Sequence, residues 1–148
     1  MFLEISQIVI VWHSDGPDNS NYGVCGQRYD STGAKLGAEF QVNTYTSGNQ
    51  WTPNIGTFSG GKFIITWQSV GQDHSSYGVY GQVFDSTGAK VGSEFQVSTY
   101  TFNFQGNSDV RTFSDGKFIV AWQSWRQDGF DYGVFGQRFQ VIRYNTGC

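Results

Sequence analysis

Three acidic side chains recur at a constant interval along this chain of 148 residues, and they are its first candidates for chemistry. Asp18, Asp73 and Asp128 follow one another at intervals of 55 residues, each in a polar loop. Carboxylate oxygens suit Ca²⁺, which takes about six to eight oxygen ligands. Asp15 adds a carboxylate to the first loop and Asp131 to the third, whereas the second loop has only one. Two interpretations stay open: a calcium site, or a turn in which the Asp side chain accepts hydrogen bonds from nearby backbone amides.

A second group of candidates combines aromatic rings with amide side chains. Residues 45–51 and 100–105 are loops rich in both, and two more rings follow in the third copy of the pattern. Stacking rings beside hydrogen-bonding amides suit a carbohydrate ligand, but large rings also dominate contacts between protein subunits. The candidate ligand or interface residues are Tyr45, Trp51, Tyr100, Phe102, Phe104, Trp125 and Phe130.

Residues for acid–base or nucleophilic catalysis form no recognisable set. The two histidines, His13 and His74, occupy positions that hold other residue types in the other copies, and neither can be placed beside a nucleophile. General acid–base catalysis requires a group whose pKa is tuned by its site, and solvated loop residues seldom meet this requirement. The sequence therefore predicts a protein that is not an enzyme and has no cofactor, with Ca²⁺ as the alternative.

Composition narrows the class of partner. Charged residues make up 14% of the chain and the net charge is −3, so no basic surface is available for nucleic acid. The apolar run 8–12 is too short to cross a membrane and has no basic leader. Polarity is carried by Ser, Thr, Asn, Gln and Gly, which favours an extracellular or cell-surface protein.

Nearly the whole chain is one unit written three times. Trp12, Trp67 and Trp122 recur at the same interval of 55 residues, and the segment Tyr-Gly-Val-x-Gly-Gln begins at residues 22, 77 and 132. A fixed period of this size indicates a repeat architecture. The approximate units are 1–46, 47–101 and 102–148 of a single domain, and we expect the three tryptophans to mark the core of each unit.

Each unit reads as four short strands. In the middle copy they are predicted at 53–59, 62–68, 77–84 and 94–98, because apolar residues alternate there and turn residues separate the runs. Glycine-containing turns are expected at 59–61, 114–116, 30–35 and 85–90. Copy one begins inside its first strand, because residues 2–4 align with residues 57–59 of the middle copy. Copy three loses the pattern after Phe139, where residues 141–144 are expected to be extended but paired differently.

The predicted fold is all-β, with three four-stranded units arranged like the blades of a β-propeller. A β-trefoil is the alternative, since three units close on themselves in that fold. The period of 55 residues favours propeller blades, which run about 40 to 50 residues in common families. Propellers usually close with about four to eight blades, so three blades predict open edges and association with other copies.

The two cysteines give little information about compartment. Cys25 replaces an aromatic residue of the other copies and is expected to be an apolar filler. A disulfide between Cys25 and Cys148, or between chains, is the alternative, because two cysteines follow no spacing rule.

The repeat resembles tandem repeats of large bacterial and protist surface proteins. The resemblance is carried by 61–69, by Gln72-Asp73, by 77–85 and by 92–97. It implies adhesin-like, broadly integrin-α-like propeller blades, although integrin-type blades carry a calcium loop with several acidic residues and these loops keep only one recurring Asp. We therefore expect an extracellular structural or adhesive protein that self-associates into a ring or filament. A carbohydrate-binding module, either dependent on calcium or independent of it, is the alternative function.

Overall fold

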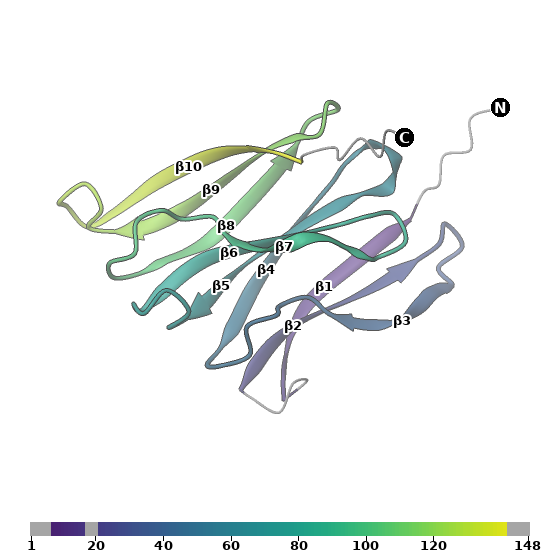
Figure 1. Cartoon of the computed structure of the whole chain (residues 1–148), viewed down its shortest axis with the longest axis horizontal. Coiled ribbons are helices and arrows are strands. Elements are labelled where there is room, and N and C mark those ends of the chain that lie inside the picture. Colours follow the sequence, from purple (N-terminus) through teal and green to yellow (C-terminus); the bar gives the residue numbers. More distant parts are fainter. Residues whose placement is uncertain (1–6, 17–20, 142–148) are drawn as a thin grey trace.

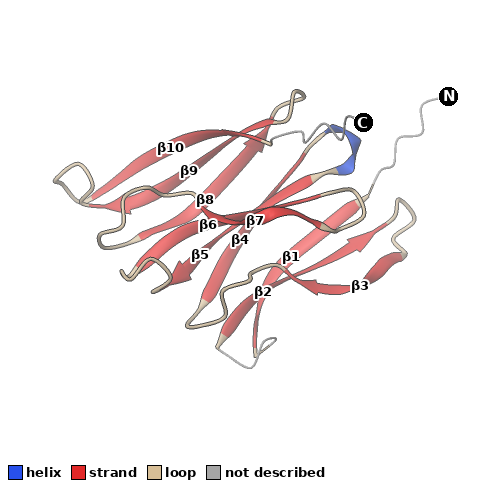
Figure 2. Ribbon diagram, viewed as in Figure 1, coloured by secondary structure: helices blue, strands red, loops and turns tan. Residues whose placement is uncertain are grey.

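The fold consists of ten β-strands and one short 3₁₀ turn in the described part of the chain, residues 7–16 and 21–141 of a computed structural model (Figures 1 and 2). The 3₁₀ turn, η1, covers Ser59–Gly61. The strands are β1 (Ile8–Asp15), β2 (Tyr22–Tyr29), β3 (Lys35–Gln41), β4 (Gln50–Thr57), β5 (Phe63–Val70), β6 (Tyr77–Phe84), β7 (Lys90–Gln96), β8 (Gln105–Thr112), β9 (Lys117–Trp125) and β10 (Tyr132–Gln140).

The strands form three antiparallel sheets, each a meander that follows chain order. The first sheet is β1-β2-β3, the second β4-β5-β6-β7 and the third β8-β9-β10, and the second lies between the other two (Figure 1). The predicted all-β, propeller-like fold is confirmed. The trefoil alternative is wrong, because in the described residues the strands of different sheets do not join into a closed barrel.

Only the middle sheet shows all four predicted strands. The first and third sheets have three each within the described ranges. Residues 2–4, predicted to end the first strand of copy one, lie outside those ranges. So do residues 142–144, which complete the extended segment predicted from Val141 onwards.

The predicted strands of the middle unit match β5 and β6 well and the outer strands less well. β4 begins at Gln50, ahead of Pro53, because a bulge between Trp51 and Asn54 places the proline where a ladder hydrogen bond is not needed. β7 begins at Lys90, since a register shift and the positive φ of Gly92 (71°) interrupt the alternation of apolar residues. The starts of β4 and β7 were therefore predicted wrongly, because a bulge interrupts the period-two alternation from which they were predicted.

The hairpin turns form as their residue types predict. Asp30 Oδ1 accepts hydrogen bonds from the backbone N–H groups of Thr32 (2.8 Å) and Ala34 (3.0 Å). Asp85 Oδ1 repeats both contacts at the same distances in the β6–β7 turn. The glycine of each turn, Gly33 or Gly88, has a φ of 86°, which a β-carbon disfavours.

The hydrophobic core lies between the sheets and not within them. One cluster joins the first and second sheets and contains Phe63, Ile65 and Trp67 from β5. The other joins the second and third sheets and contains Ile64 from the opposite face of β5 together with Trp122 from β9. A strand buried on both faces is what the uninterrupted apolar sequence of β5 predicts.

Trp12 differs from its two counterparts. Trp67 and Trp122 are 0% and 4% exposed, whereas Trp12 is half-buried. Trp67 faces the first sheet and Trp122 faces the second, so each tryptophan fills the joint with the preceding sheet. In the described residues no sheet precedes the first one, and Trp12 therefore keeps part of its surface open.

Cys25 is buried in β2, opposite Trp12 on β1, in the manner expected of an apolar filler. Cys148 lies outside the described residues, so the disulfide alternative stays a prediction. The described residues contain no helix of the length and hydropathy needed to span a bilayer.

Candidate functional site

Strands β2, β6 and β10 begin at the same end of the three sheets (Figure 1). Aromatic rings near these strand starts form a continuous row across all three sheets. Tyr22, Tyr77 and Tyr132 are the first residues of these strands and occupy the same position in the three repeats. Trp51 lies between the first two tyrosines and Phe104 between the second and third. We call these five residues, together with Trp125, the aromatic row.

Ring distances show that the row is unbroken. The Trp51 ring is 6.1 Å from Tyr22 and 6.1 Å from Tyr77, with which it is stacked at an interplanar angle of 12°. Phe104 is 5.3 Å from Tyr77 and 6.0 Å from Tyr132. Centroid separations of about 4.5 to 7 Å are those of favourable aromatic pairs. The row thus ties neighbouring sheets together at one end.

The two rings that fill the gaps come from different positions of the repeat. Trp51 corresponds to Gly106 in the third copy, and Phe104 corresponds to Asn49 in the second. A β-carbon on Gly106 would clash with Oε1 of Gln68 and would lie 2.6 Å from Cζ of Phe104, so these two side chains occupy the space that a side chain at 106 would take. Each joint therefore holds one aromatic ring, which reaches it from strand β4 in one case and from the residue before β8 in the other.

The row is partly open to solvent, more so towards the third sheet. Tyr22 is 38% exposed and Tyr132 is 60% exposed, while Trp51, Tyr77 and Phe104 are half-buried. Trp125 closes the row, with its ring 4.8 Å from Tyr132. A row of this kind offers ring faces and edges to a ligand without losing the packing that fixes their positions.

An open pocket of about 430 Å³ lies at the exposed end of the row. Phe104, Trp125 and Tyr132 supply its rings, and Ser76 and Asn103 supply a hydroxyl and an amide. The guanidinium of Arg126 lies 5.4 Å from the centre of the Trp125 ring, a cation–π distance that helps to hold this ring in place. Rings, a hydroxyl and an amide therefore converge on one volume.

The predicted aromatic candidates separate into three places. Trp51, Phe104 and Trp125 belong to the row. Tyr45 lines a different pocket beside Glu94 of β7, whose carboxylate accepts a hydrogen bond from the backbone N–H of Thr44 at 2.6 Å.

The other three candidates lie outside both pockets. The rings of Tyr100 and Phe102 contact each other at 5.8 Å, and Phe130 is 82% exposed in the β9–β10 loop. Sequence reasoning missed Tyr22, Tyr77 and Tyr132 as site residues. Their recurrence at the start of each third strand was the signal for them.

Those candidate calcium ligands that the structure describes do not gather at one point. Asp73 Oδ1 accepts a hydrogen bond from Ser75 N (3.0 Å), and Asp128 Oδ1 accepts one from Phe130 N (3.3 Å), which is the geometry of an Asp that caps its own turn. Asp15 ends β1 and Asp131 precedes β10, both exposed, and Asp18 lies outside the described residues. Within the described ranges no three Asp, Glu, His or Cys side chains are close enough to share a metal ion.

A solved structure with a similar fold is that of an endo-arabinase from Bacteroides thetaiotaomicron VPI-5482. It superposes with a TM-score of 0.54 at 14% sequence identity, over 91% of this chain and 52% of that one, so this chain spans about half the length of that structure. Such a likeness shows the fold. Neither a protein-family model nor the sequence of a curated protein matches this chain.

The prediction that the protein is not an enzyme is contradicted by this comparison, because the similar structure is that of an enzyme. The prediction relied on the absence of a His or carboxylate set that recurs in every repeat. A site formed where loops of several sheets meet can take a different residue from each copy, and no recurrence is then required.

Proposed function

We propose that the protein binds carbohydrate chains along the aromatic row, with the pocket beside Trp125 and Tyr132 as the main contact. The observation that supports this most directly is the uninterrupted series of rings across three sheets, with Ser76 and Asn103 at its exposed end. Aromatic side chains present a rigid apolar surface at low conformational cost, and hydroxyl and amide groups then set orientation. An extended row suits a chain of sugars better than a single one.

The fold of the endo-arabinase adds support, because its name places a similar arrangement of sheets in a protein that acts on a polysaccharide. Soluble arabinan is therefore the first ligand to test, together with a glycan array. Isothermal titration calorimetry with and without a chelator measures binding and any dependence on Ca²⁺. Assay of released reducing ends in the same samples measures cleavage.

The variant Tyr132→Ala tests the site, since its ring is 60% exposed and the Trp51 and Phe104 rings that fill the two joints are unchanged. We expect the dissociation constant to rise about tenfold. Phe113→Ala is the matched control: this ring is 52% exposed but lies in the β8–β9 turn, at the opposite end of the third sheet. Equal binding by the wild type and Tyr132→Ala, or no binding to any glycan, contradicts the proposal.

Self-association of copies is a second candidate function, and the two outer sheet faces favour it. Ile8 and Ile10 are 54% and 50% exposed, whereas Phe63 and Ile65, at the same repeat positions, are fully buried in the joint between sheets. Val134 on the other outer face is 78% exposed. These faces correspond to the two sides of an internal joint, so an end-to-end contact between copies would repeat that joint.

Sedimentation velocity over a hundredfold range of concentration tests the self-association. We expect species larger than the monomer at high concentration and their loss in Ile10→Asp. A monomer at every concentration excludes this second function and does not bear on the proposal of carbohydrate binding.

A further inference from the structure

β10 is the outermost strand of the third sheet, and no strand in the described part of the chain pairs with its outer edge. The equivalent strands of the other two sheets, β2 and β6, pair on that edge with β3 and β7. An edge strand presents unpaired N–H and C=O groups that accept a further strand. The β2–β3 and β6–β7 pairings therefore indicate which kind of strand the outer edge of β10 can bind.

The two strands that fill the equivalent edges share one sequence pattern. β3 reads Lys-Leu-Gly-Ala-Glu-Phe-Gln and β7 reads Lys-Val-Gly-Ser-Glu-Phe-Gln, so both follow Lys-x-Gly-x-Glu-Phe-Gln. Both are antiparallel to their partners, and both have a register shift near the middle of the pairing. In each case the phenylalanine lies opposite a glycine: Gly26 opposite Phe40 and Gly81 opposite Phe95.

A glutamine on the receiving strand recognises the glycine of this pattern. Gln27 Nε2 donates a hydrogen bond to the carbonyl of Gly37 at 3.2 Å, and Gln82 Nε2 donates one to the carbonyl of Gly92 at 3.1 Å. The positive φ of Gly37 and Gly92, 75° and 71°, turns the backbone at this point. The glutamine thereby fixes the register of the incoming strand.

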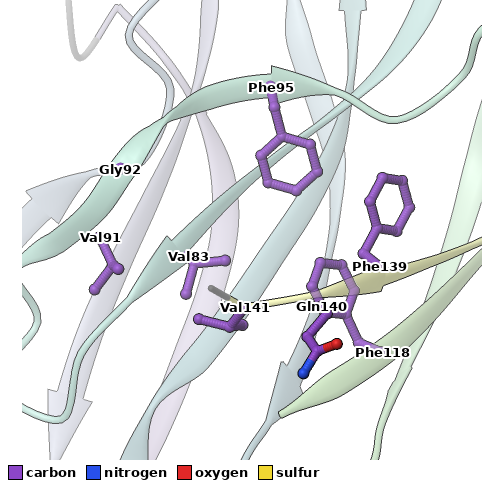
Figure 3. A pocket seen from close by; sticks show the side chains of 8 residues that line it. All are labelled: Val83, Val91, Gly92, Phe95, Phe118, Phe139, Gln140 and Val141. Atoms are coloured by element: carbon purple, nitrogen blue, oxygen red, sulfur yellow. The ribbon is translucent and has the colours of Figure 1, made fainter. Parts of the chain in front are cut away.

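The glycine opposite the phenylalanine provides space for its ring. A β-carbon on Gly26 would lie 2.7 Å from Cζ of Phe40, and one on Gly81 would lie 3.0 Å from Cζ of Phe95. Figure 3 shows the Phe95 ring close to the rings of Phe118 and Phe139, which are 6.4 and 5.5 Å away. Glycine is therefore needed on the receiving strand because the ring packs directly over its backbone.

β10 carries the same receiving groups with the space above them open. Gly136 and Gln137 occupy the positions of Gly81 and Gln82. A β-carbon on Gly136 would meet nothing nearer than the Val120 carbonyl oxygen at 3.5 Å. Gln137 is exposed where its counterpart Gln82 is buried. β10 thus supplies the receiving side of such a pairing, and no strand of the described residues supplies the other side.

We propose that the outer edge of β10 is a docking site for an extended segment with the pattern Lys-x-Gly-x-Glu-Phe-Gln. The segment adds an antiparallel fourth strand to the third sheet through main-chain hydrogen bonds, a recognised mode of peptide binding. Its phenylalanine ring lies over Gly136, and its glycine carbonyl accepts a hydrogen bond from Gln137. This interaction surface is separate from the aromatic row and does not depend on carbohydrate binding.

A synthetic peptide with the sequence of residues 88–98, labelled at its N-terminus, tests the site by fluorescence anisotropy with the full chain. We expect saturable binding at one peptide per protein. Replacing the peptide phenylalanine by alanine should weaken binding roughly 10- to 100-fold, because the burial of one large apolar ring is lost. A scrambled peptide of the same composition should not bind.

Protein variants locate the binding to the edge. Gly136→Val places a side chain where the ring would lie, and Gln137→Ala removes the group that recognises the glycine; both should weaken binding at least about tenfold. Neither position is packed in the described structure, and circular dichroism checks that both variants fold. Glu39→Ala, exposed on β3 of the first sheet, is the control and should bind as the wild type does. The proposal is overturned if the wild type fails to bind the peptide, or if Gly136→Val binds it equally well.

Discussion

Thr66 and Ser108 place two hydroxyl groups in the buried joint between the second and third sheets. Their oxygen atoms are 3.0 Å apart, and Thr66 is fully buried on β5 while Ser108 is 8% exposed on β8. The contact connects sheets that share few other side-chain hydrogen bonds in the described residues. A buried hydroxyl without a partner is costly, so each of these two groups depends on the other.

The losses of stability from replacing Thr66 and Ser108 singly should not be additive, because each single replacement leaves the other hydroxyl buried without its partner. Thr66→Val keeps the shape but leaves the Ser108 hydroxyl buried without its partner, which should cost about 1–3 kcal/mol in the free energy of unfolding. The double variant Thr66→Val/Ser108→Ala should lose clearly less than the sum of the two single losses. Urea denaturation measures all four proteins. Additive losses would show that the hydroxyl pair contributes nothing.

Single residues differ in how far the sequence reveals their roles. The turns at 30–35 and 85–90 were recognisable from their glycines, and the turn-capping role of Asp73 was one of the two interpretations that its loop allowed. The aromatic row was recognised only in part. Trp51 and Phe104 lie at different repeat positions, and their contacts with the recurring tyrosines are formed only in the folded structure. The open groups on β10 could not be read from the sequence either, since they are open only because no strand of the described residues pairs with that edge.

At the scale of elements, the β2–β3 and β6–β7 hairpins are both closed by a charged aspartate. The Thr87 hydroxyl donates a hydrogen bond to Asp85 at 2.6 Å, and Thr32 does the same for Asp30. These hydroxyl bonds, followed by those from the backbone N–H groups of the turn, hold the pKa of each carboxyl below its ordinary value of 3.8. The folded state therefore favours the ionised form of both groups.

The sign of the pH dependence follows from this direction. Because the folded pKa lies below the unfolded one, the stabilisation is complete above pH 3.8 and is lost as the pH falls through the folded pKa. Asp85→Asn removes the charge and keeps the shape, so it should lower the melting temperature at pH 7 and much less at pH 2. Thermal unfolding by circular dichroism at both pH values measures this. An equal loss at the two pH values would mean that the charge of Asp85 has no part in the turn.

Elements were predicted from sequence as far as their residues alternate. β6 was predicted to the residue, because Tyr-Gly-Val-Tyr-Gly-Gln-Val-Phe has no irregularity and both of its faces are buried. β4 and β7 contain bulges at Thr52 and Gly92, whose positive φ angles of 48° and 71° break the period. A bulge depends on the pairing with a neighbouring strand, and a single segment does not contain that information.

The whole molecule is stabilised by joints between sheets. Each hydrophobic cluster takes residues from two neighbouring sheets, and the middle sheet contributes one face to each cluster. Gly56 of β4 lies so close to β8 that a β-carbon there would be 2.9 Å from Cγ2 of Thr112. The sheets are thus the repeating units of a chain in which stability depends on contacts between nearest neighbours.

A single repeat should therefore not fold alone. In isolation, residues 47–101 would expose the faces of β5 that hold Ile64, Ile65 and Trp67, all fully buried in the complete chain. We expect this fragment to lack near-ultraviolet circular dichroism and to unfold without a cooperative transition. The complete chain serves as the control. Cooperative unfolding of the fragment would show that the core lies within one sheet.

The aromatic row also gives the protein an optical property. Tyrosine emission overlaps the absorption of tryptophan, and Tyr22 and Tyr77 lie on either side of Trp51 at 6.1 Å, while Tyr132 contacts Trp125 at 4.8 Å. Light absorbed by these tyrosines is therefore passed to the two indoles over very short distances. Unfolding, which moves these tyrosines far from the tryptophans, would restore tyrosine emission, so the native chain reports the loss of its own joints without an added label.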